Sequence, residues 1–158
     1  MKIVIGISDA YVSNEPGDLL ITHSLGSCIG IGLYDPVAKV GALLHYMLPQ
    51  GSLDPKKSQT DPFRFGDVAI PKLFELAYKL GATKPNIKVV MAGGANVLKN
   101  QNVFNIGHRN ITIARKLFWK NRIFVESEEV GGEIPRTLSL DMSSGCFYLQ
   151  SKGVRFAL

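Results

Sequence analysis

Hydrophobic residues occur in short runs before residue 50 and in longer, helix-like patterns after residue 65. The runs at 2–7, 18–24, 28–34 and 40–47 are rich in Val, Ile and Leu. Short apolar runs bounded by Gly, Pro, Asn and Asp are typical of buried strands. The first third of the chain is therefore predicted to form four strands, and 35–39, which begins with Asp-Pro, is predicted to be a hairpin turn.

The later apolar positions follow the helical period. They predict one helix over 66–80, ended by Gly81, and a second over 106–120. The inward residues expected in the second helix are Ile106, Ile111, Ile113, Leu117 and Phe118. The polar segment 49–62 contains three prolines and is predicted to be a loop, either a plain surface loop or one that contacts a substrate.

Further short apolar runs complete the pattern as strands at 87–91, 123–127, 136–141 and 146–150. The chain has 158 residues, 46% of them hydrophobic, which is enough for one substantial core. Hairpins outnumber strand-helix-strand crossovers in this pattern. The prediction is a single domain over 1–158 of the α+β (mixed α/β) class, with packed, largely antiparallel or mixed β-sheets flanked by helices.

Charge adds little to this prediction. The formal net charge is +5, but the basic residues are dispersed, and the densest group, between 109 and 122, is typical of a solvated helix face. Nucleic-acid binding is disfavoured, since it usually needs a concentrated basic patch. The apolar run at the start is too short for a secretory signal, and the uncharged stretch 19–34 is too short for a membrane span. We therefore expect a cytoplasmic monomer that does not insert into membranes.

The chemistry of the N-terminal strands centres on Cys28, which follows Leu-Gly-Ser. If the strands around 35–39 pair so that the numbers of partner residues add up to 73, Cys28 lies opposite His45. A tight turn at 25–27 would likewise place Thr22 opposite Cys28. These two hairpins predict that three side chains from three successive strands converge.

These residue types suit acyl transfer through a thioester. A free thiol ionises near pH ~8.5, so it needs a base such as His45 to become a nucleophile at neutral pH. Thr22 could hold the other ring nitrogen of His45, and the backbone N–H groups of Ser27 and Cys28 are the expected oxyanion donors. This chemistry requires no metal and no organic cofactor.

Less specific readings of the same residues remain open. A lone cysteine is more often a core residue than a nucleophile. Cys146 lies in a predicted strand and is expected in the core, although a disulfide or a redox pair with Cys28 is possible. A metal site at Cys28, His45 and His23 lacks ligand spacing. His23 is expected to face away from Thr22, and His108 to lie on the surface of the second helix.

Five motifs in order support the enzymatic reading. They are LGSC (25–28), HYMLP (45–49), GGA (93–95), IGHRN (106–110) and the GG, R and DMSSG residues within 131–145. Together they cover nearly the whole chain and resemble the CheD family of bacterial and archaeal chemotaxis proteins.

The resemblance implies a chemoreceptor glutamine deamidase that converts receptor Gln to Glu, with Cys28, His45 and Thr22 as the catalytic residues. It also implies a fold similar to that of toxin-type cysteine deamidases. The implied partners are methyl-accepting chemotaxis receptors and the CheC phosphatase. The alternative is a non-catalytic chemotaxis module that regulates CheC and the receptors by binding alone.

Overall fold

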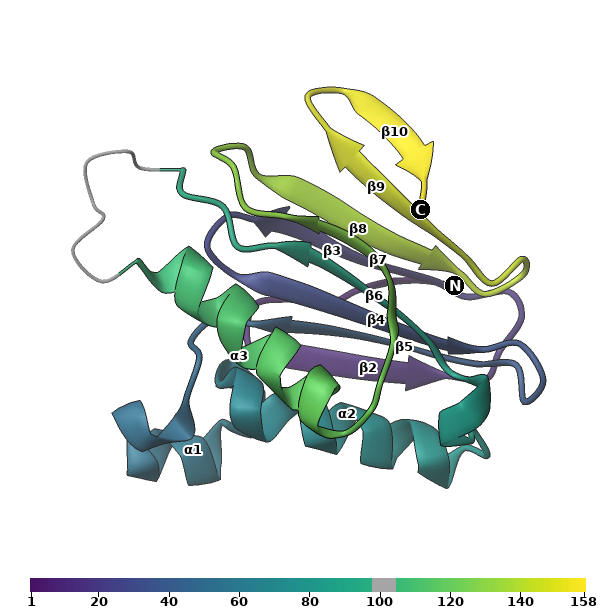
Figure 1. The fold of residues 1–158 in the computed structure, drawn as a ribbon. Helices are drawn as coiled ribbons and strands as arrows, with labels where there is room; N and C mark the ends of the chain where they lie inside the picture. The colour runs from purple at the N-terminus through teal and green to yellow at the C-terminus, as the bar shows by residue number, and fades with distance from the viewer. Residues whose placement is uncertain (98–104) are drawn as a thin grey trace.

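The computed structural model describes residues 1–97 and 105–158, which form two stacked β-sheets with helices on one side (Figure 1). The first sheet has the strand order β1 (Lys2–Val4), β3 (Leu19–Leu25), β8 (Arg136–Asp141), β9 (Cys146–Ser151) and β10 (Val154–Ala157). The second has the order β2 (Asp9–Ser13), β5 (Val40–Tyr46), β4 (Ile29–Asp35), β6 (Lys88–Gly93) and β7 (Val125–Val130). The β1–β3 and β6–β7 pairs are parallel, and the others are antiparallel. The expected mixed α+β class is confirmed.

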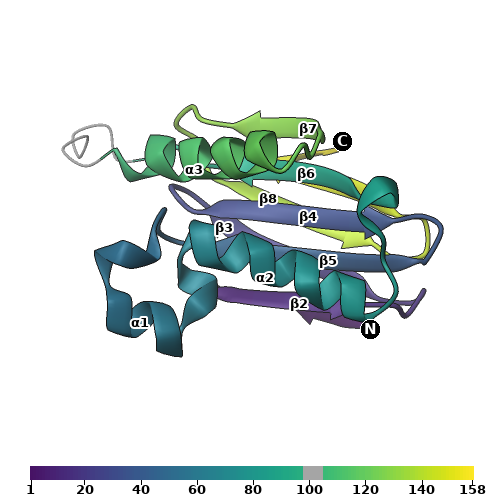
Figure 2. The same cartoon turned by 60° about the horizontal axis from the view of Figure 1, so that its bottom comes forward.

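The second sheet is the middle layer of the molecule. Helices α2 (Gly66–Lys79) and α3 (Ile106–Lys120) lie across its outer face, and the first sheet covers the inner face (Figure 2). Every residue of β4 and β5 is buried as a result. Burial on both faces explains why these strands are continuous apolar runs rather than alternating ones.

Both long helices form where the apolar period predicts them. Helix α2 ends before Gly81, whose φ of +105° favours glycine. Helix α3 spans 106–120 as predicted, and of the expected inward residues Ile111 and Phe118 are fully buried. Ile106, Ile113 and Leu117 are only partly buried. The fully buried positions are Gly107, Asn110, Ile111, Ala114 and Phe118. The prediction missed small and polar residues that pack directly against the sheet.

The predicted loop at 49–62 is wrong. This segment contains the 3₁₀-helix η1 (Gly51–Leu53), the short helix α1 (Pro55–Thr60) and the start of the 3₁₀-helix η2 (Pro62–Arg64). Pro55 and Pro62 each begin a helical turn, a position where the missing N–H costs nothing. The Asp54 side chain caps α1 by accepting from the Lys57 N–H at 3.2 Å. Exposed single turns have no apolar period, so the pattern could not reveal them.

The remaining differences concern the sheet edges. Strands β2 and β10 were not predicted, and the 3₁₀-helix η3 (Lys84–Asn86) precedes β6. All four residues of β10 are exposed. Edge strands of this kind carry a weak apolar signal. None of the helices in the described ranges is long and apolar enough to cross a bilayer.

Candidate active site

The segment 26–28 carries the chain from one sheet to the other. Strand β3 belongs to the first sheet, where Thr22 pairs with Leu138 of β8, whereas β4 belongs to the second sheet. The predicted hairpin between these strands is therefore wrong. Both strands are apolar whether they pair with each other or stack face to face, so the pattern does not distinguish the two arrangements. The crossover leaves Cys28 directly before the first residue of β4.

The β4–β5 hairpin exists, but its register differs by two residues from the prediction. Gly30, not Cys28, lies opposite His45, and the ladder ends at Ile29 and Tyr46. A shift of two residues keeps each side chain on the same face, whereas a shift of one would have reversed it. A Cβ added at Gly30 would point at Leu25 and Leu138 of the first sheet. Position 45 therefore faces the first sheet too.

Thr22 and His45 meet across the two sheets. The Thr22 Oγ1 and the His45 Nδ1 are 2.7 Å apart, and both side chains are fully buried. Thr22 also donates its hydroxyl proton to the Ile5 carbonyl oxygen at 2.7 Å. Since a hydroxyl has one proton, Thr22 must accept from a protonated Nδ1. The Nε2 atom of His45 then carries the lone pair.

That lone pair is available for chemistry. Nε2 is buried and has no hydrogen-bond partner among the described residues. Burial without a charged partner lowers the pKa of His45 to about 4, because the imidazolium would be poorly solvated. At neutral pH the ring is a neutral base with one fixed tautomer.

Cys28 is half-buried, whereas His45 is fully buried. Burial raises the pKa of the thiol above its ordinary value, and a hydrogen bond from its own backbone N–H opposes this only partly. The resting pair is therefore a neutral thiol and a neutral imidazole. Among the described residues, neither the Ser27 nor the Cys28 amide donates to a backbone oxygen, and the Cys28 N–H is directed at its own sulfur.

The buried imidazole should make the fold sensitive to acid. In the unfolded chain His45 regains an ordinary pKa near 6.5, so the unfolded state binds more protons between pH 6.5 and 4. This contribution to stability is complete above pH ~6.5, and by pH ~4 about 3 kcal/mol of the free energy of unfolding should be lost. The measurement is urea denaturation at several pH values. His45→Gln, which cannot titrate, should flatten this part of the profile, and an unchanged slope would contradict the assignment.

The segment that follows β6 holds the backbone around Cys28, and the sequence prediction gave it no role. The Gly94 N–H donates to the Cys28 carbonyl oxygen at 2.9 Å, and the Ala95 N–H donates to the Gly26 carbonyl oxygen at 2.7 Å. Gly93 has a φ of +110°, and a Cβ there would overlap the Cys28 carbonyl oxygen. The consecutive glycines of the GGA motif were the available signal, since such pairs permit close backbone approach.

The other candidate residues lie apart from this group. His23 and His108 are exposed, as expected. Cys146 is exposed at the start of β9, so its predicted place in the core is wrong. Alternate residues of β9, beginning with Cys146, point away from the core. Both cysteines are free thiols. The described ranges contain no cluster of three or more His, Cys, Asp or Glu that could hold a metal ion.

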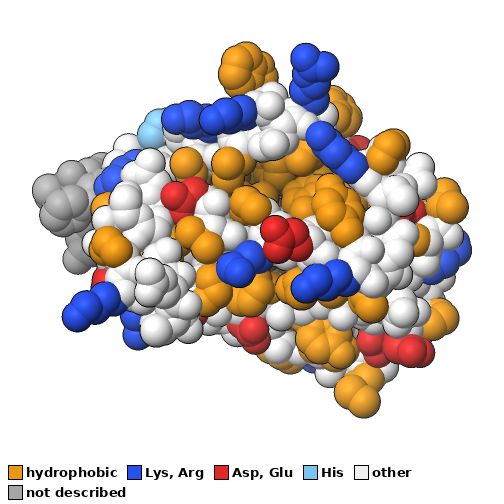
Figure 3. Space-filling view, turned by 90° about the horizontal axis from the view of Figure 1, so that it is seen from below, with side chains coloured by type: hydrophobic (Ala, Val, Ile, Leu, Met, Phe, Trp, Pro, Cys, Tyr) orange, Lys and Arg blue, Asp and Glu red, His pale blue; other side chains and the backbone are white. Residues whose placement is uncertain are grey.

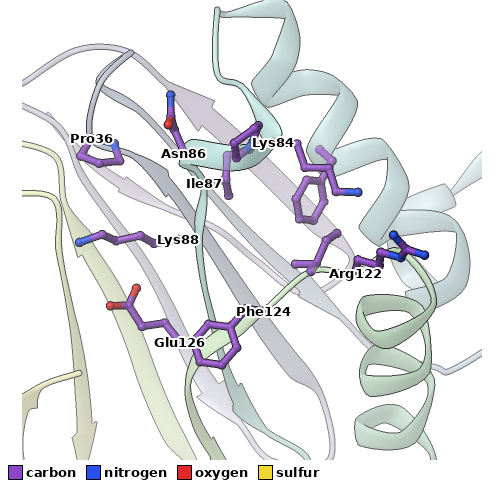
Figure 4. Close-up of a pocket in the computed structure, with 11 residues that line it drawn as sticks. Pro36, Lys84, Asn86, Ile87, Lys88, Arg122, Phe124 and Glu126 are labelled. Carbon is purple, nitrogen blue, oxygen red and sulfur yellow. The ribbon is translucent and has the colours of Figure 1, made fainter.

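A hollow of about 590 Å³ lies elsewhere on the molecule. Its lining includes Pro36, which follows β4, the residues 84–88 before and at the start of β6, and Arg122, Ile123, Phe124 and Glu126 before and at the start of β7 (Figure 4). Cys28 precedes β4, so this hollow and the thiol lie at opposite ends of that strand. Apolar and basic side chains both gather on this face of the molecule (Figure 3). The hollow takes no part in the arrangement around His45.

Comparison with known proteins identifies the family. The family described as CheD chemotactic sensory transduction matches residues 47–151. A probable chemoreceptor glutamine deamidase CheD 1 of Syntrophus aciditrophicus is 48% identical over 96% of this chain and 94% of its own length. The chain belongs to the CheD family.

Other comparisons agree with this assignment or are neutral. A probable chemoreceptor glutamine deamidase CheD of Solibacter usitatus is 42% identical over 96% of this chain and 90% of its own length. The CheD family match begins after His45, whereas both relatives span nearly the whole chain. Among solved structures, the hypothetical protein YfiH of Bacillus licheniformis gives a TM-score of 0.49 at 12% identity, covering 77% of this chain and 49% of the other.

Proposed function

We propose that this chain is a chemoreceptor glutamine deamidase of chemotaxis, with Cys28 as nucleophile, His45 as base and Thr22 as the residue that orients His45. The observation that carries the proposal is the buried Thr22–His45 contact of 2.7 Å, which leaves the His45 Nε2 unpartnered. Gly30 lies opposite His45, and the half-buried Cys28 precedes Gly30 by two residues, a spacing that puts both side chains on one face. The names of the CheD relatives supply the substrate class.

The proposed reaction starts from the neutral pair. As the Cys28 sulfur attacks the carbon of a glutamine side-chain amide, the thiol proton passes to the His45 Nε2. The C–N bond then breaks, and the imidazolium gives this proton to the departing ammonia, which leaves a thioester. Water attacks the thioester, with His45 accepting its proton, and the products are glutamate and the regenerated thiol.

Two features of the site support transition-state stabilisation. The amides of Ser27 and Cys28, which donate to no backbone oxygen among the described residues, are the proposed oxyanion donors. A neutral resting pair also avoids burying a thiolate and an imidazolium before substrate binds, which would cost desolvation energy. Charge separation then occurs only in the substrate complex.

The proposed partners follow from the family. Methyl-accepting chemotaxis receptors are the substrates, which places the protein in the cytoplasm, and CheC is a binding partner. The net charge of +5 would assist encounter with an acidic receptor surface without setting specificity. Residues 1–158 are proposed to act as one deamidase domain.

The test is mass spectrometry of a receptor cytoplasmic fragment after incubation with the wild-type chain. Deamidation adds about 1 Da per glutamine, and peptide mapping assigns the position. We expect the gain at a small number of glutamines in a time-dependent manner. No gain across several receptors, with the protein folded and still bound to them, would contradict the deamidase and favour the binding module.

A further inference from the structure

One buried side chain joins the two backbone segments of the proposed site. Asn110 lies on α3 with none of its surface exposed. Its Nδ2 group donates to the Ser27 carbonyl oxygen at 2.8 Å and to the Met47 carbonyl oxygen at 2.9 Å. Ser27 directly precedes Cys28, and Met47 is two residues beyond His45.

These bonds lie where the hairpin opens. The β4–β5 ladder ends at Ile29 and Tyr46, so the next backbone pair is no longer held by the sheet. Asn110 spans this gap with both of its amide protons, one for each strand end. The Asn110 carboxamide thus takes the place of the missing ladder bonds, and it does so without using the Cys28 N–H.

The helix itself is anchored at the same point. The hydroxyl of Tyr46, fully buried beside His45, donates to the Asn110 carbonyl oxygen at 2.6 Å. Asn110 is therefore fixed by β5 through its backbone and holds the Cys28 segment through its side chain. Hydrogen bonds that form such a network hold their residues more firmly than a single bond would.

We propose that Asn110 is a positioning residue that sets the distance between the Cys28 thiol and the His45 imidazole. The expected effect of Asn110 on turnover rests on the proposed function, whereas its effect on the position of the Cys28 segment does not. Displacing a nucleophile by about 1 Å can lower a rate by about a hundredfold. Without the two bonds, the hydrogen bonds that other segments of the described ranges make to the 26–28 backbone would be those from the Gly94 and Ala95 N–H groups.

A purely stabilising Asn110 would behave differently. Its loss would lower the free energy of unfolding while leaving the folded enzyme with normal turnover and normal thiol accessibility. A positioning Asn110 predicts two changes of opposite sign in the folded variant. The deamidation rate falls because the thiol is misplaced, and the thiol reacts faster with a small reagent because the segment around it opens.

The experiment compares Asn110→Ala with Asn121→Ala, both in the Cys146→Ser background so that only Cys28 is alkylated. Asn121 is an exposed amide at the other end of α3, where its Nδ2 donates to the Leu117 carbonyl oxygen at 2.8 Å. For Asn110→Ala we expect kcat to fall about 10- to 100-fold with KM within about threefold. Iodoacetamide should alkylate its Cys28 about tenfold faster, whereas Asn121→Ala should match the parent in both assays.

Each outcome decides the proposal. Alkylation and turnover both within twofold of the Asn121→Ala control would overturn it, as would a loss of kcat with unchanged alkylation. If Asn110→Ala does not fold, Tyr46→Phe removes only the anchoring hydroxyl and should shift both measurements in the same directions by about threefold; no shift would overturn the proposal. If the wild type does not deamidate receptors, the alkylation rates alone still test whether Asn110 holds the Cys28 segment.

Discussion

Cys28→Ser is expected to lower the rate of receptor deamidation by at least about a thousandfold, while the fold is retained. The change replaces one atom in a half-buried side chain, so packing is nearly preserved. Serine is a far weaker acid than a thiol, and the His45 imidazole, whose pKa is about 4, is too weak a base to activate it well. The measurement is the initial rate of Gln to Glu conversion, followed by peptide mass spectrometry.

The matched control is Cys146→Ser, which changes the same atom in the chain's other free thiol. Cys146 is exposed and lies at the start of β9, so we expect its replacement to leave the rate within about twofold of the wild type. Retention of more than about a tenth of the wild-type rate in Cys28→Ser would assign the reaction to another group. Equal losses in both variants would instead favour a pair of redox-active cysteines.

The sequence predicted that Thr22 and His45 lie together, but not the way in which they meet. Cys28, His45 and Thr22 were selected as neighbours, and Thr22 does contact His45. That contact is made between stacked sheets, not along a hairpin. The β4–β5 register was wrong by two residues, an even number that preserved the face. The alternation of side chains along a strand determines which face of the sheet each side chain is on. The residue that lies directly opposite on the partner strand depends instead on turn geometry and on where the ladder ends.

Residues that act through their backbone or a buried amide were not found as site residues. Asn110 belongs to the IGHRN motif, but a polar residue in an amphipathic helix is normally predicted to be exposed. Its burial depends on two carbonyl oxygens supplied by segments 63 and 83 positions away. The same limit applies to 49–62, where exposed helical turns give no apolar period. Long-range hydrogen bonding is the information that a local pattern lacks.

Gly93→Ala is expected to be the most damaging change outside the three proposed catalytic side chains. Alanine pays a cost of about 1–2 kcal/mol for adopting the φ of +110°. Its Cβ would also overlap the carbonyl oxygen of Cys28, which is backbone and cannot rotate away. Forcing the two segments apart adds overpacking of about 1–3 kcal/mol, so the free energy of unfolding should fall by roughly 2–5 kcal/mol in total.

Gly81→Ala separates these two terms. Gly81 has a nearly equal φ of +105°, but nothing lies within 4 Å of a Cβ added there. Urea denaturation of the two variants should differ by the overlap term alone. Because the Cys28 carbonyl accepts from the Gly94 N–H, any shift that relieves the overlap also moves the nucleophile. Gly93→Ala should therefore lose at least about tenfold in kcat, with Gly81→Ala unchanged. Equal stability and equal turnover in the two variants would show that the close approach of β6 to Cys28 does not position the nucleophile.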